Sequence, residues 1–135
     1  MNYNKAYQII EQWSTKMTFI FVALGGAVGA CARYAISLIP VKSQFPILTL
    51  ITNLLGALLI GFIVGIAESR NVSKNTMLFL KTGVCGGFTT FSTFSLEAYS
   101  ILSTRNYGLC GLYVALSVVG CIAGVWCGKK LAAMA

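Results

Sequence analysis

Four long apolar runs constrain the fold of this chain more than any other feature. They cover about residues 18–39, 47–67, 77–103 and 108–128, and a helix needs roughly 20 residues to cross ~30 Å of hydrocarbon. Because 57% of the residues are apolar and only 10% are charged, the chain has more apolar surface than one small soluble core can bury. The sequence therefore predicts an all-α, multi-pass integral membrane protein with four transmembrane helices.

The four runs nearly fill the chain, which leaves room for one domain. We expect a four-span domain at residues 17–130, preceded by an N-terminal extension at residues 1–16 and followed by a C-terminal tail at residues 131–135. The first run carries Arg33 and lacks a convincing small-residue cleavage site. We therefore interpret it as a retained span and not as a signal peptide.

The net charge of +7 at pH 7 indicates membrane topology and no nucleic-acid partner, because lysine and arginine normally decorate the loops of membrane proteins. Seven basic residues fall on the side of the N-terminus and three on the opposite side, which favours both termini in the cytoplasm. The first set is Lys5, Lys16, Arg70, Lys74, Lys81, Lys129 and Lys130, and the second is Arg33, Lys42 and Arg105.

Few side chains in this chain are suited to catalysis. There is no histidine, and the only acids are Glu11, Glu68 and Glu97, so most routes to general acid–base or metal catalysis are missing. We expect no enzyme. The cysteines form no CxxC pair and are predicted to be buried thiols that pack as small hydrophobes. They are Cys31, Cys85, Cys110, Cys121 and Cys127.

Polar residues inside the spans are informative because they are costly there. Asn53 is the one strongly polar side chain of the second run, and its amide either bonds a neighbouring helix or meets a permeating species. Arg33 in the first run must pair, bind an anion or snorkel to the membrane boundary. Gly25 and Gly29 in the first run, and Gly61 in the second, predict close helix packing.

The third run contains "GVCGGFTTFSTFSLEAYS" at residues 83–100. Two adjacent glycines followed by two threonines predict a helix break near Gly86–Thr90, with Gly86 where the chain leaves helical dihedrals. A break frees backbone carbonyls, which are good ligands for a small hard cation such as sodium. Phe91 and Phe94 share a helical face, where they either pack in the core or present their positive ring edges to a small anion.

The fourth run places Tyr113, Ser117 and Cys121 on one helical stripe, because they are spaced four residues apart. A phenol and a hydroxyl on one stripe either continue a track of hydrogen-bond donors or bond neighbouring helices. The spacing alone leaves both alternatives open.

Three motifs, in order, resemble the Fluc (CrcB) family of fluoride channels. They are "GGAVGACARY", "TLITNLLG" and "GVCGGFTTFSTFSLE", within a resemblance that covers residues 17 to about 130. The string "GGFTTFSTFS" is highly specific, because generic lipid-facing sequence has little chance of producing it. The resemblance implies a fluoride-selective ion channel of the cell membrane that exports fluoride passively and protects the cell from fluoride toxicity.

The resemblance also implies an assembly. Members of this family are antiparallel, dual-topology homodimers of four-helix subunits, double-barrelled, with a central structural sodium ion. Backbone carbonyls of Gly86 and Thr89 would bind that sodium, and the other partners would be fluoride and the lipid bilayer. A dual-topology subunit ordinarily has little charge bias, whereas seven basic residues oppose three here. An oppositely oriented paralogue is therefore the alternative partner.

The resemblance assigns a fluoride pathway to particular residues. Asn53 would stand at the pore, the ring edges of Phe91 and Phe94 would face fluoride, and Glu97 would lie near a pore mouth. Leu48 departs from the family, because many members have a glycine at its position. The other pathway residues would be a polar track of Ser92, Thr93, Tyr113 and Ser117, together with Arg33 as the family's first-span arginine.

Two rival functions come from other classes. A small four-span, proton-coupled multidrug exporter also forms antiparallel dimers, but its chemistry needs a carboxylate deep in the membrane, expected in the first span. The first run holds no acid, and Glu97 lies late in the third. A non-transporting membrane scaffold subunit would leave the hydroxyl cluster without a transport role.

Overall fold

The structure, a computed structural model, describes the backbone of residues 3–135 and the side chains of residues 17–135. All regular elements in this range are helical. The predicted extension at residues 1–16 therefore lies outside the residues whose side chains are described. Three helices are long: α1 (Tyr3–Ser37), α2 (Ile47–Ser69) and α6 (Tyr107–Ala132). The predicted all-helical fold is confirmed over this range.

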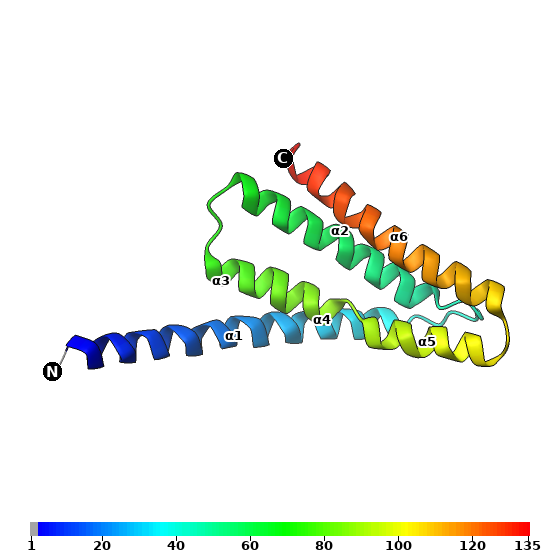
Figure 1. Ribbon diagram of the computed structural model, residues 1–135, viewed down its shortest axis with the longest axis horizontal. Helices are drawn as coiled ribbons and strands as arrows, with labels where there is room; N and C mark the ends of the chain where they lie inside the picture. The colour runs from blue at the N-terminus through cyan, green and yellow to red at the C-terminus, as the bar shows by residue number, and fades with distance from the viewer. Residues whose placement is uncertain (1–2) are drawn as a thin grey trace.

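Length and apolar composition make three helical segments candidate membrane spans: Met17–Ser37 of α1, all of α2 and all of α6. The third apolar run is instead a chain of shorter elements laid end to end beside α1 (Figure 1). These elements, which we call the third segment, are α3 (Lys74–Met77), the π-helix η1 (Leu78–Cys85), α4 (Gly86–Phe88) and α5 (Phe91–Ser103).

The break in the third segment lies at Thr89 and Thr90. Their dihedrals are extended, with φ −78° and ψ 156° at Thr89 and φ −147° and ψ 111° at Thr90. Gly86 keeps helical dihedrals of φ −64° and ψ −37°, so the prediction that the chain leaves the helix at this glycine is wrong. The new helix begins where Thr90 caps it, since the Thr90 side chain accepts a hydrogen bond from the Thr93 amide.

Glycines join α1 to η1 and α4. A methyl group added to Gly25 would meet the backbone of Phe79 and Gly83, and one added to Gly29 would meet the backbone of Val84 and Phe88. α1 and the third segment run in the same direction, because successive glycines of α1 meet successive residues of the third segment. The predicted close packing at Gly25 and Gly29 is confirmed. We call α1 and the third segment together the broken pair.

A second pair consists of α2 and α6, which also run in the same direction (Figure 1). A methyl group on Gly61 would meet the backbone of Val125, and one on Gly128 would meet the carbonyl of Leu58. Small residues thus let the two backbones approach closely, as predicted for Gly61. We call this unit the continuous pair.

The outer surface of the helices is apolar. Leu24, Val119 and Ile122 are 57%, 65% and 68% exposed, as expected of side chains that face lipid. The same arrangement corrects the prediction for the cysteines: Cys85 is buried, Cys110 and Cys121 are half-buried, but Cys31 and Cys127 are exposed. A small apolar residue on a membrane helix does not need the protein interior, because lipid also accepts it.

Candidate functional site

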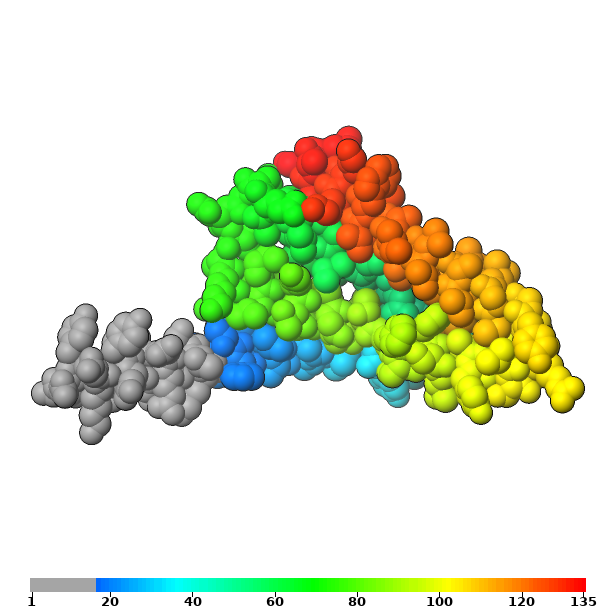
Figure 2. Space-filling view, viewed as in Figure 1, coloured from blue at the N-terminus to red at the C-terminus, as the bar shows by residue number. Residues whose placement is uncertain are grey.

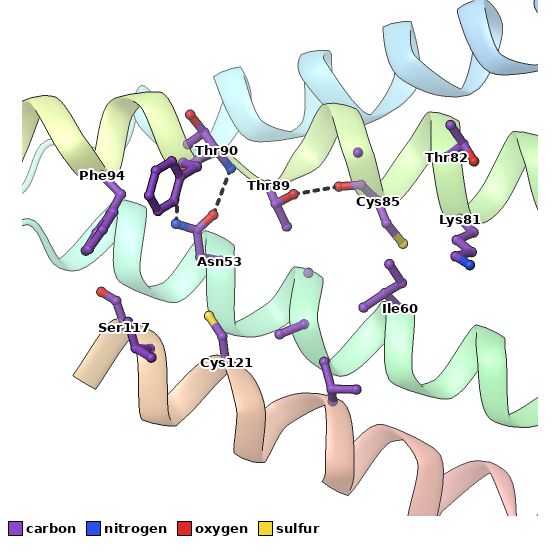
Figure 3. A pocket seen from close by; sticks show the side chains of 16 residues that line it. Asn53, Ile60, Lys81, Thr82, Cys85, Thr89, Thr90, Phe94, Ser117 and Cys121 are labelled. Atoms are coloured by element: carbon purple, nitrogen blue, oxygen red, sulfur yellow. Dashed lines mark hydrogen bonds between the residues drawn. The ribbon is translucent and has the colours of Figure 1, made fainter. Parts of the chain in front are cut away.

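The two pairs meet near α5 and diverge toward the other end of the molecule, and the surface is hollowed between the third segment and the continuous pair (Figure 2). A groove of about 590 Å³ lies there. Side chains of α2, the third segment and α6 converge on it (Figure 3). Predicted site residues that line it are Asn53, Gly86, Thr89, Phe91, Phe94 and Ser117.

Asn53 on α2 bridges to the break. Its Oδ1 accepts a hydrogen bond of 2.8 Å from the Thr90 N–H, and its Nδ2 donates one of 3.1 Å to the Thr90 carbonyl (Figure 3). The side chain thus substitutes for a backbone partner on both groups of one extended residue. An amide has two N–H donors, so one donor of this groove-lining residue remains in addition to the bridge.

The same bonds free two carbonyls. In a continuous α-helix the N–H of residue i+4 donates to the carbonyl of residue i, so Thr90 would reach Gly86 and Thr93 would reach Thr89. Instead the Thr90 N–H donates to Asn53, and the Thr93 N–H donates to Thr90 Oγ1 at 3.2 Å. The carbonyls predicted to bind sodium therefore lose their intrahelical donors.

Arg33 lies on the other side of the break. Its Nε donates to the Gly87 carbonyl at 3.3 Å, so this guanidinium pairs with a carbonyl that the break exposes. Arg33 and Thr93 line a separate small cavity of about 60 Å³. Neither residue lines the groove that holds Asn53, although Thr90 lines both cavities.

The two phenylalanines differ in environment. Phe91 is 79% exposed, whereas Phe94 is 9% exposed, although their ring centroids are only 5.6 Å apart. Phe94 packs on Tyr113, with ring centroids 5.1 Å apart and planes inclined by 49°. Phe94 thus combines core packing with a place on the groove, and Phe91 projects from the chain.

Ser117 is the unpartnered polar group of the site. The residue is 6% exposed, and among the described residues its Oγ has no hydrogen-bond partner. A buried hydroxyl without a partner is costly. Ser117 lines the groove opposite the third segment (Figure 3), so its unpartnered hydroxyl lies at the wall of the groove.

Tyr113 does not line the groove. It is fully buried, and its hydroxyl donates to Glu97 Oε2 at 2.7 Å. Thr49 Oγ1 donates to Glu97 Oε1 at 2.8 Å, so one carboxylate joins α2, α5 and α6. Sequence reasoning missed Thr49, although it lies one turn before Asn53 on α2 and that spacing is a usable signal.

Ser92 is also outside the groove lining. It is exposed, and its Oγ lies 3.3 Å from Thr90 Oγ1. Tyr113, Ser92 and Thr93 therefore do not line the groove that Ser117 lines. The structure adds Lys81, which sequence reasoning treated as a loop charge and which lines the groove.

The chain is similar in sequence to known proteins over most of its length. Residues 20–129 match the family model described as CrcB-like protein, Camphor Resistance (CrcB). The chain is 48% identical over 118 residues to a Clostridium perfringens protein named fluoride-specific ion channel FluC, which covers 84% of this chain and 91% of that protein.

Two further relatives carry the same name. A Methanococcus maripaludis protein is 44% identical over 111 residues, which is 82% of this chain and 91% of that protein. A Flavobacterium psychrophilum protein is 40% identical over 119 residues, which is 85% of this chain and 96% of that protein. With its apolar helices, the chain is a multi-pass protein of the cell membrane. The match over most of its length confirms the resemblance that its motifs indicated, and the chain belongs to the CrcB family.

Proposed function

We propose that this chain forms a fluoride-selective channel that exports fluoride passively across the cell membrane and so protects the cell from fluoride toxicity. Its relatives are named fluoride-specific ion channels, a transport function and not catalysis. The observation that carries the proposal is the groove at the break, where the Asn53 amide, the Phe94 ring and the unpartnered Ser117 hydroxyl converge.

The chemistry of these groups suits a small anion. Fluoride is tightly hydrated, so a pore must replace its water with hydrogen-bond donors. The second N–H of Asn53 and the hydroxyl of Ser117 are such donors, and the positive edge of the Phe94 ring adds to them without a fixed charge. Larger anions would be poorly solvated in a track built from so few donors.

Fluoride efflux from liposomes tests this function. Vesicles that carry the purified protein and contain potassium fluoride are diluted into potassium-free buffer. A potassium ionophore then lets potassium leave down its gradient, and a fluoride electrode records fluoride release. We expect rapid fluoride release and little release of chloride from matched vesicles. Uptake of protons coupled to export of a cationic dye would indicate the multidrug exporter instead. A scaffold subunit would give neither signal.

We also propose that the channel is a double-barrelled, antiparallel homodimer of four-span subunits. Two features of the chain support a partner subunit at this face. Phe91 is 79% exposed, and a methyl group on Gly86 would meet nothing within 4 Å. Both residues line the open groove.

Two measurements test the assembly. The mass of the detergent-solubilised protein reports dimerisation, and C-terminal reporters that work on only one side of the membrane report orientation. Activity of both reporters supports dual topology. One orientation only would favour an oppositely oriented paralogue as the partner.

A structural sodium ion between the subunits is the third part of the proposal. Gly86 and Thr89 would hold it through the two carbonyls that lose their helical donors, since carbonyl oxygens suit a hard cation. A cation bound only in the assembled state stabilises that state.

Replacing sodium by N-methylglucamine throughout preparation should therefore lower the dimer fraction, and a sodium titration should restore it. Thr89→Ser should be tolerated because it keeps the carbonyl. An unchanged dimer fraction and unchanged flux in sodium-free preparations would remove the ion from the proposal.

A further inference from the structure

The groove carries a fixed charge at the end away from Phe94. Lys81, in the π-helix η1, is exposed and lines the groove together with Ile60 of α2 (Figure 3). Of the described residues that line it, Lys81 bears the only formal charge. Asn53 and Ser117 line the same groove nearer the break (Figure 3). One continuous surface therefore leads from an ammonium group to two hydrogen-bonding side chains.

Nothing in the described chain neutralises this ammonium. Within residues 17–135, Lys81 pairs with no carboxylate. Of the acids in that range, Glu68 bonds Lys129 at 2.7 Å, and Glu97 accepts hydrogen bonds from Thr49 and Tyr113. The remaining groove lining is mainly apolar, and low-dielectric walls focus the field of a charge along a cleft.

We propose that Lys81 is the anion-recruiting residue of the groove: its ammonium raises the local fluoride concentration at one mouth and so increases flux. The inference rests on the proposed function and adds to it the electrostatic control of entry. Lys81 acts before the ion reaches Asn53 and Ser117, and it does so at a distance. A lysine that merely snorkels to the membrane boundary would have no such effect on an anion in the groove.

Ionic strength separates these two roles. The Debye length is about 30 Å at 0.01 M salt and about 3 Å at 1 M, so recruitment by a fixed charge weakens as salt rises. Fluoride flux through the parent protein, at constant fluoride, should therefore fall when an impermeant bulky salt is raised across this range. A salt-independent parent flux would overturn the inference without any variant.

Substitutions supply the second test. Lys81→Gln removes the charge, and flux at low salt should fall about threefold or more, with the deficit vanishing at high salt. With Lys81→Glu the flux at low salt should fall further, whereas Lys81→Arg should retain the parent flux and its salt dependence. Lys74→Gln is the matched control, because Lys74 lies on the same segment but does not line the groove. Its flux should equal that of the parent.

The outcomes distinguish the two proposals. A parent that releases no fluoride overturns both the function and this inference. A parent that conducts, with a folded Lys81→Gln dimer that conducts equally well at every salt concentration, overturns only the inference. If Lys74→Gln lowers flux as much as Lys81→Gln, the effect is a general surface charge and the groove has no special part in it.

Discussion

The broken pair and the continuous pair use the same packing device for different ends. In both, glycines bring two backbones into contact: Gly25 and Gly29 in the first, Gly61 and Gly128 in the second. In the continuous pair both partners are uninterrupted helices, so backbone groups within them are paired in their own helix. In the broken pair, Thr89 and Thr90 leave the helix.

The difference shows where backbone polarity becomes available in a membrane. Irregular backbone at membrane depth is tolerated only where protein buries it or where it lines a cavity. Here Asn53 and Arg33, from two other helices, bond the groups at the break, and the groove opens beside it. The continuous pair thus contributes the side-chain groups of Asn53 and Ser117 to the groove, whereas the broken pair contributes the Phe94 ring and the backbone groups that the break frees.

The largest effect is expected where Asn53 of the continuous pair bonds Thr90 at the break. Asn53→Asp keeps the shape but replaces the Nδ2 donor to Thr90 with a second oxygen, and it puts a negative charge beside an anion path. The variant loses the Nδ2 bond to the Thr90 carbonyl and the second N–H offered to fluoride, so at ~1–3 kcal/mol for each bond the flux should fall about a hundredfold. Fluoride efflux measures it, with Ser69→Ala near the end of the same helix as control. Parent-like flux in the Asp variant would confine the amide to helix bridging.

A pair of neighbouring glycines sharpens the contrast. Gly87→Ala should destabilise the protein by about 2 kcal/mol, because its methyl group would meet the backbone of Gly26 and lie 3.1 Å from the Ala30 nitrogen. Gly86→Ala should cost the single chain nothing, since it meets no atom within 4 Å and alanine favours the helix. Thermal unfolding in detergent compares the two.

The bulkier Gly86→Val then tests the assembly alone. A lower dimer fraction or lost flux, without loss of the subunit fold, indicates a partner packed against Gly86. Equal damage from Gly86→Ala and Gly87→Ala would contradict the difference between the two faces of α4.

The phenylalanines give a smaller, divided effect. Replacing either Phe91 or Phe94 by Ile keeps apolar bulk but removes the positive ring edge, so flux should fall by up to about tenfold in both. Only Phe94→Ile should also reduce the free energy of unfolding, by about 1 kcal/mol, because only Phe94 packs on Tyr113. Its unfolding temperature should therefore be lower than that of the parent. Undiminished flux in a well-folded dimer of either variant would argue against a ring-edge role.

The smallest effect lies in the continuous pair. Lys129 and Glu68 join the ends of α6 and α2 at 2.7 Å, but their side chains are 44% and 58% exposed. Solvent screens such a pair, so Lys129→Gln should cost less than about 0.5 kcal/mol and leave flux unchanged. Thermal unfolding and efflux on one preparation measure both. A flux change as large as that of Lys81→Gln would show that distant charges, too, control entry.

Sequence reasoning located the site better than it arranged the site. The motif at residues 83–100 predicted a break near Gly86–Thr90, and the break at Thr89 and Thr90 lies inside that range. Asn53 was singled out as the polar residue of the second run. Its partner was not predictable, because Thr90 is 37 residues away along the chain. Helical spacing likewise put Tyr113 and Ser117 on one stripe, yet Tyr113 bonds Glu97 whereas Ser117 has no partner.

The sequence by itself determined that the chain lies in a membrane as apolar helices, since the length and hydrophobicity of each run are local properties. It also determined which run is interrupted. Only the tertiary structure decided the exact point of the break, because Thr90 leaves the helix by bonding Asn53 on α2, while Gly86 stays helical. It alone placed Lys81 in the groove, since which face of a helix meets a cavity depends on where the other helices pack.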